Sequence, residues 1–180
     1  MAGSVPDARV RGAITRPQGF SYRIVVRRAT LEDLDQVVAL RLALLREEER
    51  NPFFANPHPD ADARAVELTR GELTAPGEVI LVASMDDAIV GMLRCRLVRR
   101  MPLVAGDRQA VVTTVYVVPA QRRRGVLSAL LNAADLWCRQ KGVTDMRLQC
   151  ALSNDAGRKA WESLGFTPAE TVYLRTIPGE

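Results

Sequence analysis

Metal-binding residues are scarce in this sequence, which has one histidine and three cysteines among 180 residues. The cysteines, Cys95, Cys138 and Cys150, are far apart, and none belongs to a C-x-x-C pair. Structural zinc sites draw on closely spaced pairs of such ligands, so the composition argues against a metal centre. We expect the three thiols to be free, in a reducing compartment.

Aromatic residues make up only 5% of the chain, and they do not alternate with the basic residues. A stacking platform for single-stranded nucleic acid needs that alternation. The net charge of +4 comes from 25 basic and 21 acidic residues, and it suits a small anionic ligand as well as it suits nucleic acid. A nucleic-acid interface needs a basic stripe beyond one loop, and one further cluster is present: Arg94, Arg96, Arg99 and Arg100. Nucleic acid is therefore disfavoured as a partner.

Long apolar runs are also missing from the sequence. No run reaches the roughly 20 residues that span a bilayer, and residues 1–20 lack the apolar core of a signal peptide. Residues 1–21 carry glycine, proline and arginine without periodicity, and we expect them to form a flexible tail. Residues 22–180 have the length of a single domain. We expect a cytoplasmic protein without a membrane partner.

The most informative stretch is a strand, a turn and a helix. Residues Val111–Val118 are apolar or β-branched at almost every position, which is typical of a strand buried on both faces. Pro119 cannot donate to a ladder and ends this strand. A helix is predicted from near Gly125 to Gln140, because apolar residues recur there with a helical period: Val126, Ala129, Leu130, Ala133 and Trp137.

The turn between this strand and helix has the composition of a phosphate site. Arg122, Arg123 and Arg124 supply fixed positive charge and several donors each. Gly125 lets a ligand approach the backbone, and the residues after it present the unpaired N–H groups of a helix start: Val126, Leu127 and Ser128. The spacings of a Walker loop and of a dinucleotide fingerprint are both absent. A solvated basic helix start is the alternative interpretation.

The remaining chain alternates between strand and helix patterns. Strands are predicted over 22–28, 78–84, 88–98, 145–150 and 173–177, and helices over 30–45, 61–73 and 155–164. Gly91 inside the third of these strands indicates a bulge. Together with the central strand and helix, these segments predict an α/β fold with a mixed sheet of about six to seven strands and about four flanking helices.

Two sequence motifs follow one another along the chain. The first runs from Val117-x-Pro119 into Arg122-x-x-Gly125-x-Leu127, and the second is Asn154-x-x-Gly157…Trp161-Glu162-x-x-Gly165-Phe166. They resemble the patterns V-x-P…[RQ]-x-x-G-x-[GA] and N-x-x-A…Y-E-x-x-G-F of the GNAT superfamily of N-acetyltransferases. Leu127 departs from the first pattern, and Gly157 and Trp161 depart from the second. The resemblance extends from Arg23 to Ile177.

The resemblance implies that acetyl-CoA donates an acetyl group to a primary amine, which attacks the thioester while both substrates are bound. In the family, the loop N–H groups hold the CoA pyrophosphate, and a backbone N–H near the end of the central strand, here at Val117 or Val118, faces the developing oxyanion. The implied cofactor-binding residues here are Val117, Val118, Arg122, Arg123, Arg124, Gly125, Val126, Leu127, Ser128 and Asn154. Asn154 is also predicted to be the N-cap of the last helix.

The proton donor to the departing thiolate is not evident from the sequence. The family often uses a tyrosine at the position of Trp161, and an indole has no proton to give at a useful pKa. Tyr116 and Tyr173 remain as candidate catalytic residues. For the base, His58 and the carboxylates of 47–49 are candidates, although a lone loop histidine is usually incidental and a solvated helix end is the simpler interpretation of the glutamates.

The acceptor amine is left open by the sequence. Its pocket would come from residues 46–76 and the final strands, so antibiotics of the aminoglycoside type, polyamines, amino acids and protein N-termini all remain. A non-catalytic acyl-CoA-binding or sensing module is the alternative function, favoured by Leu127 and Trp161. The resemblance also allows a homodimer.

Overall fold

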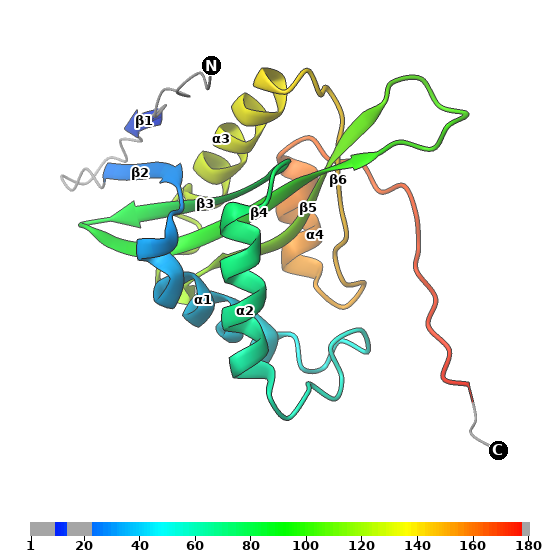
Figure 1. The fold of residues 1–180 in the computed structure, drawn as a ribbon, viewed down its shortest axis with the longest axis horizontal. Coiled ribbons are helices and arrows are strands. Elements are labelled where there is room, and N and C mark those ends of the chain that lie inside the picture. The colour runs from blue at the N-terminus through cyan, green and yellow to red at the C-terminus, as the bar shows by residue number, and fades with distance from the viewer. Residues whose placement is uncertain (1–9, 14–22, 178–180) are drawn as a thin grey trace.

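The computed structural model describes residues 10–13 and 23–177. Figure 1 shows a sheet with helices on both sides of it. The elements are, in chain order, β1 (Val10–Ala13), β2 (Arg23–Arg28), η1 (Leu31–Asp33), α1 (Leu34–Glu47), α2 (Ala61–Thr74), β3 (Glu78–Met85), β4 (Ala88–Arg99), β5 (Arg108–Val117), η2 (Pro119–Gln121), α3 (Val126–Gln140), β6 (Met146–Leu148) and α4 (Asp155–Ser163).

The sheet has six strands in the order of the sequence, β1 to β6. Successive strands from β1 to β5 pair antiparallel, whereas β6 pairs parallel with β5. A parallel pair needs a crossover connection, and α3 provides it. This connection places the start of α3 next to the end of β5. The loop between them contains Arg122, Arg123 and Arg124 and is called the arginine loop below.

Two apolar clusters fill the two sides of the sheet. One combines buried residues of β2 to β5 with the inner face of α3, including Leu93, Val126 and Leu130. The other combines the opposite side of the sheet with α1 and α2, including Val37, Ile80 and Tyr116. Strand β5 contributes to both clusters, so the prediction that it is buried on both faces is confirmed.

The predicted fold class is confirmed, since the described residues form a mixed sheet of six strands with four α-helices. The predicted bulge at Gly91 is also present, because Ala83 pairs with Gly91 while the next residue, Ser84, pairs with Ile89. A Cβ on Gly91 would lie 3.1 Å from the carbonyl oxygen of Tyr116 and 3.1 Å from a methyl group of Val126. Glycine at this position therefore lets β5 and the start of α3 approach β4 closely.

The two ends of the chain differ from the sequence predictions. Val10–Ala13 lies inside the predicted tail and forms β1, which pairs with β2; the rest of 1–21 lies outside the described residues. The predicted strand over 173–177 was wrong, because these residues form no strand and run away from the sheet (Figure 1). Strand propensity alone does not make a strand when no sheet edge lies alongside to accept its hydrogen bonds.

Candidate active site

The central feature is an open edge of β5. Strand β6 pairs with β5 only at Ala110, Val111 and Val112. The later residues of β5, through Val117, stay paired with β4 on one side, while no described strand pairs with their other side. The separation of two neighbouring strands leaves main-chain groups available to a ligand between them.

The hydrogen-bond register determines which groups face this open edge. The N–H of Val118 donates to the carbonyl oxygen of Val90 at 2.9 Å, and Val117 is paired with Gly91. In an antiparallel ladder, a hydrogen bond from Val118 to Val90 makes the neighbouring Val117–Gly91 pair a non-hydrogen-bonded one. The N–H and C=O of Val117 therefore point away from β4. Of the two oxyanion donors considered from the sequence, the Val118 N–H is therefore occupied, and the Val117 N–H faces the open edge.

The arginine loop leads directly from this strand into α3. The backbone turns through Arg123, at φ 60°, and Gly125, at φ 85°, and Gly125 is the N-cap of α3 without a side-chain cap. The first backbone bond of the helix runs from Ala129 N–H to the Gly125 carbonyl. The three preceding N–H groups, of residues 126–128, therefore have no carbonyl partner within α3, as a phosphate site requires.

The three arginines of the loop do not play the same part. All three residues are exposed to solvent. Arg122 turns back onto the protein: its Nε donates to the Val117 carbonyl at 2.9 Å, and its Nη2 donates to Glu47 Oε2 at 2.6 Å. Its guanidinium lies 5.5 Å from the centre of the Tyr116 ring. The Glu47 carboxylate raises the pKa of Arg122. From the sequence, Glu47 is a candidate base or part of a solvated helix end, and its contact with Arg122 was not predicted.

The second motif forms the start and end of α4. Asn154 caps the helix as predicted, and its Oδ1 accepts a hydrogen bond from the Gly157 N–H at 2.8 Å. Trp161 packs edge-to-face on Phe166, with ring centres 5.4 Å apart and an angle of 76°. Trp161 thus fixes the chain where it leaves the helix.

The candidate acid and base residues lie in different environments. Tyr116 is buried under α1 and α2, beside the loop. Tyr173 is 90% exposed in the extended C-terminal segment. His58 is exposed, and its Nδ1 accepts a hydrogen bond from the Asp60 N–H at 3.1 Å in a local turn. Of the two tyrosines and His58, the structure therefore brings only Tyr116 to the arginine loop, and the candidate base Glu47 also lies there, bound to Arg122.

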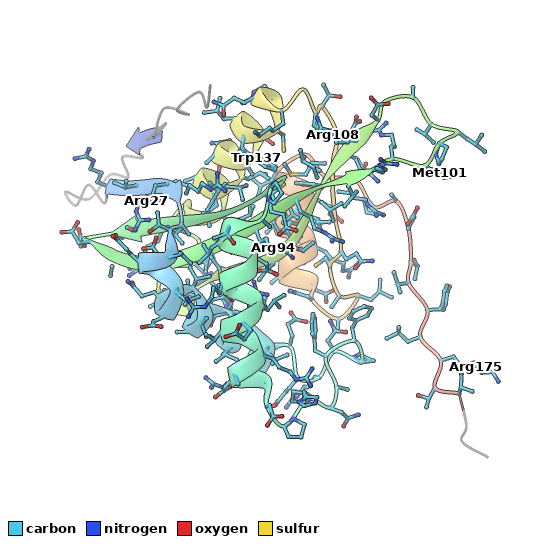
Figure 2. All side chains as sticks on the ribbon, viewed as in Figure 1. Arg27, Arg94, Met101, Arg108, Trp137 and Arg175 are labelled. Carbon is cyan, nitrogen blue, oxygen red and sulfur yellow. The ribbon has the colours of Figure 1, made fainter. Side chains whose placement is uncertain are left out.

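A charged network that the sequence did not reveal ties α1 and α2 to the sheet. Glu72 of α2, which is only 6% exposed, pairs with Arg41 of α1 and lies 3.3 Å from Arg94 of β4. Arg94 also binds Glu78 of β3 at 2.6 Å, and Figure 2 labels it where α2 crosses the sheet. Burial raises the pKa of Glu72. Arg94 is thus engaged in the fold and does not belong to an exposed basic stripe.

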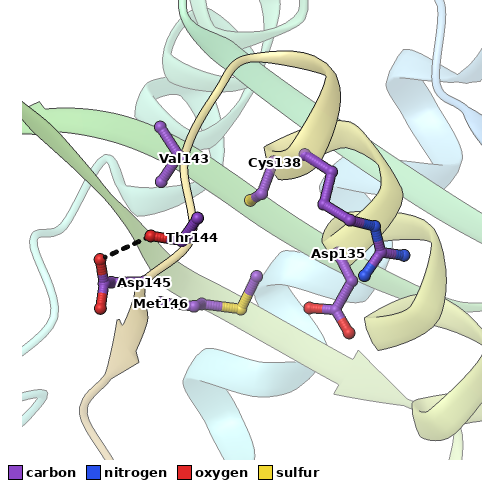
Figure 3. Close-up of a pocket in the computed structure, with 7 residues that line it drawn as sticks. Asp135, Cys138, Val143, Thr144, Asp145 and Met146 are labelled. Atoms are coloured by element: carbon purple, nitrogen blue, oxygen red, sulfur yellow. Dashed lines mark hydrogen bonds between the residues drawn. The ribbon is translucent and has the colours of Figure 1, made fainter.

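A small pocket of about 70 Å³ lies elsewhere, between the C-terminal end of α3 and the start of β6. Figure 3 shows Asp135 and Cys138 on its helix side and Val143 to Met146 on the other, with Thr144 hydrogen-bonded to Asp145. It is at the opposite end of α3 from Gly125 and is not part of the candidate site.

Within residues 10–13 and 23–177, there is no acidic, histidine or cysteine cluster that could hold a metal ion. In that same part of the chain, no helix has the length and apolarity to cross a membrane.

Comparison with known proteins connects this geometry to one family. The sequence model of the Acetyltransferase (GNAT) family matches residues 42–166. An aminoglycoside N(6′)-acetyltransferase type 1 from Stenotrophomonas maltophilia is 30% identical over 158 residues, 86% of this chain and 94% of its own. A protein of the same name from Acinetobacter haemolyticus is 33% identical over 128 residues, 69% of this chain and 84% of its own. A solved aminoglycoside N-acetyltransferase in complex with CoA has the same fold, with a TM-score of 0.70 at 20% identity over 91% of this chain and 99% of its own.

Proposed function

This chain belongs to the GNAT family of acetyltransferases and transfers the acetyl group of acetyl-CoA to a primary amine, and we propose that the acceptor is the 6′-amine of an aminoglycoside. The observation that carries the transfer chemistry is the open edge of β5 running into the uncapped start of α3. The acceptor class is supported by two relatives, both named aminoglycoside N(6′)-acetyltransferase type 1, that align with more than two thirds of the chain.

The loop would hold acetyl-CoA through its phosphates. Gly125 and the first turn of α3 (Val126, Leu127 and Ser128) would direct N–H groups at the pyrophosphate, with the positive end of the helix dipole behind them. Leu127 replaces a smaller family residue, but its backbone N–H is retained. Arg123 and Arg124 would add exposed positive charge. Asn154 would face the CoA arm with its amide nitrogen, since its oxygen caps α4.

The thioester carbonyl would lie at the end of β5. The Val117 N–H faces the open edge and would donate to the oxygen as negative charge develops on it during attack by the amine. The acceptor must arrive as, or become, a neutral amine, because an alkylammonium with a pKa of about 10.4 has no lone pair. Carboxylates in the segment between α1 and α2, such as Glu48 and Glu49, would attract a polycationic acceptor.

Of the two candidate acids, we favour Tyr116 over Tyr173 as the proton donor to the departing CoA thiolate. Tyr116 lies next to Val117 at the end of β5, whereas Tyr173 is almost fully exposed within its own chain. Tyr116→Phe is expected to lower kcat about tenfold. An unchanged kcat would assign protonation of the thiolate to water.

The acceptor is tested with a matched pair of aminoglycosides, one carrying a 6′-amine and the other a 6′-hydroxyl. We expect thiol release from acetyl-CoA only with the amine, and a mass increase of one acetyl group on the sugar. If neither is acetylated while polyamines or peptides are, the acceptor class is wrong. If acetyl-CoA binds in calorimetry but no amine releases thiol, the chain is the non-catalytic acyl-CoA-binding module.

The chain is also proposed to act as a homodimer in the cytoplasm. The C-terminal segment exposes apolar side chains that a second copy would cover: Val172, Tyr173, Leu174 and Ile177. Light scattering after size exclusion tests this, and the truncation of residues 172–180 is expected to convert a dimer into a monomer. A monomeric full-length chain would refute it.

A further inference from the structure

We propose that Arg122 is a positioning residue that clamps the end of β5 to the end of α1, and is not a ligand of the CoA phosphates. This proposal rests on the proposed function, because it assigns a part to one residue of that same site. The signal is the direction of the Arg122 side chain, which points back onto the protein and binds both Val117 and Glu47.

The clamp fixes one peptide group from both ends. The peptide between Val117 and Val118 is planar, with its C=O and N–H on opposite sides. Its N–H donates to Val90 at 2.9 Å, and its C=O accepts from Arg122 at 2.9 Å. With both polar groups engaged, this peptide cannot rotate, and the adjacent N–H of Val117, the proposed oxyanion donor, keeps its direction. Preorganised donors of this kind stabilise a transition state without reorganisation.

The Nη2 atom of the same guanidinium binds Glu47, next to the segment between α1 and α2 that would receive the amine acceptor. Glu47 is the last residue of α1, and the connection to α2 begins directly after it. Its carboxylate binds Arg122 Nη2 at 2.6 Å, and the Tyr116 ring lies against the same guanidinium. A single planar group thus joins the strand that would hold the thioester to the segment that would receive the amine. Arginine suits this part because its donors are arranged in a rigid fork.

The two roles of Arg122 predict opposite consequences for Glu47→Gln. A phosphate ligand that is released from its carboxylate partner would bind CoA more tightly. If Arg122 is a positioning residue, loss of its Glu47 partner would lower kcat, as Arg122→Gln does. We expect Glu47→Gln and Arg122→Gln each to lower kcat by about tenfold through misplacement of the reacting groups, with the Kd for acetyl-CoA within about threefold of the wild type.

The experiment measures kcat, and the Kd for acetyl-CoA as a function of salt concentration, in the full chain. Arg122→Gln, Glu47→Gln and their double variant are compared with Arg123→Gln and Arg124→Gln. Loss of a phosphate contact flattens the salt dependence of CoA binding, because screening acts on that charge pair. We expect this flattening for the variants at 123 and 124 only, and a double variant no worse than either single one.

Arg122→Lys separates charge from shape. The lysine retains the positive charge but cannot hold Val117 and Glu47 together, so we expect it to resemble Arg122→Gln. The proposal is overturned if Arg122→Lys restores wild-type kcat, if Arg122→Gln flattens the salt dependence, or if Glu47→Gln tightens CoA binding. Failure of the wild type to bind acetyl-CoA would instead count against the proposed function, and thermal unfolding of each variant identifies a folding defect.

Discussion

The carboxamide of Asn154 lies directly over the Cα of Gly157, one turn into α4. Gly157 donates its N–H to Asn154 Oδ1 at 2.8 Å, and a Cβ on Gly157 would lie 2.7 Å from Asn154 Nδ2. Real Cβ atoms do not come this close to a neighbour, so the side chain of Asn154 would have to leave its capping position. Glycine at 157 and asparagine at 154 therefore depend on each other.

Gly157→Ala is expected to remove this N-cap. Alanine gains about 1 kcal/mol of helix propensity over glycine, and the lost cap costs about 1 kcal/mol, so the free energy of unfolding changes little. Asn154→Ala alone is expected to cost about 1 kcal/mol. Urea denaturation of both single variants and the double variant checks this, because Asn154→Ala costs nothing further once the cap is gone. Additive effects would show that alanine fits beneath an intact cap.

Gly125→Ala tests the approach of the phosphates to the loop. Gly125 has φ 85°, and Gly142, at the other end of α3, has φ 70° with open space around it. Alanine in this left-handed region costs about 1 to 2 kcal/mol, so both variants are expected to lose similar stability. Only Gly125→Ala is expected to weaken acetyl-CoA binding, by about tenfold, because its Cβ stands at the start of the helix. Equal Kd values in calorimetry for the two variants would place the cofactor elsewhere.

The sequence predicted the loop and its helix well because their signals are local. Pro119 ends the strand, Gly125 supplies the left-handed turn, and the helical period continues to Gln140, where α3 ends. The same holds for Gly91, whose bulge follows from a glycine inside a strand pattern. Each of these features depends on residues within a few positions of one another.

Contacts between distant residues could not be predicted in this way. The partner of Arg122 is 75 residues away in the sequence, and a run of glutamates at a helix end gave no sign of it. The same applies to Glu72, which lies 31 residues from Arg41. The incorrect prediction of a strand over 173–177 has a related cause. A strand-like sequence indicates that a segment can pair in a sheet, but not whether the edge of a sheet lies beside it.

Asp33 is expected to make stability depend on pH at the acidic end. Arg27 donates two hydrogen bonds to its carboxylate, at 2.6 and 2.7 Å, and the Thr30 N–H donates a third at 2.8 Å. The hydrogen bonds from Arg27, with those from Thr30, hold the pKa of Asp33 below its ordinary value of 3.8 despite burial. Folding therefore favours the ionised form, and this stabilisation is present above pH 3.8 and is lost as the pH falls through the folded pKa.

Asp33→Asn is accordingly expected to lower the free energy of unfolding by about 2 kcal/mol at neutral pH. The difference from the wild type is expected to shrink as the pH is lowered through the acidic range. Asp35→Asn, an exposed carboxylate in the first turn of α1, is the matched control and should show little change. Denaturant unfolding at neutral and acidic pH measures both, and a constant difference between Asp33→Asn and the wild type would contradict the assignment.

Trp161 occupies the position where the family often carries a tyrosine, and the structure gives it a packing part against Phe166. Trp161→Ala removes this edge-to-face pair and the apolar area around it, and is expected to cost about 2 kcal/mol of stability. Trp161→Phe keeps an aromatic ring, so most of the stability and the wild-type kcat are expected to remain. Thermal unfolding and thiol-release assays compare the two variants.

Trp161→Tyr completes this test, because it returns a phenol to the position without removing the aromatic ring. We expect kcat to stay close to that of the wild type, since the chain already has Tyr116 beside the loop. A rise in kcat of tenfold or more would show that protonation of the thiolate limits the wild-type reaction. In that case the substitution of tryptophan for tyrosine in this chain has slowed catalysis, and Tyr116 is not its proton donor.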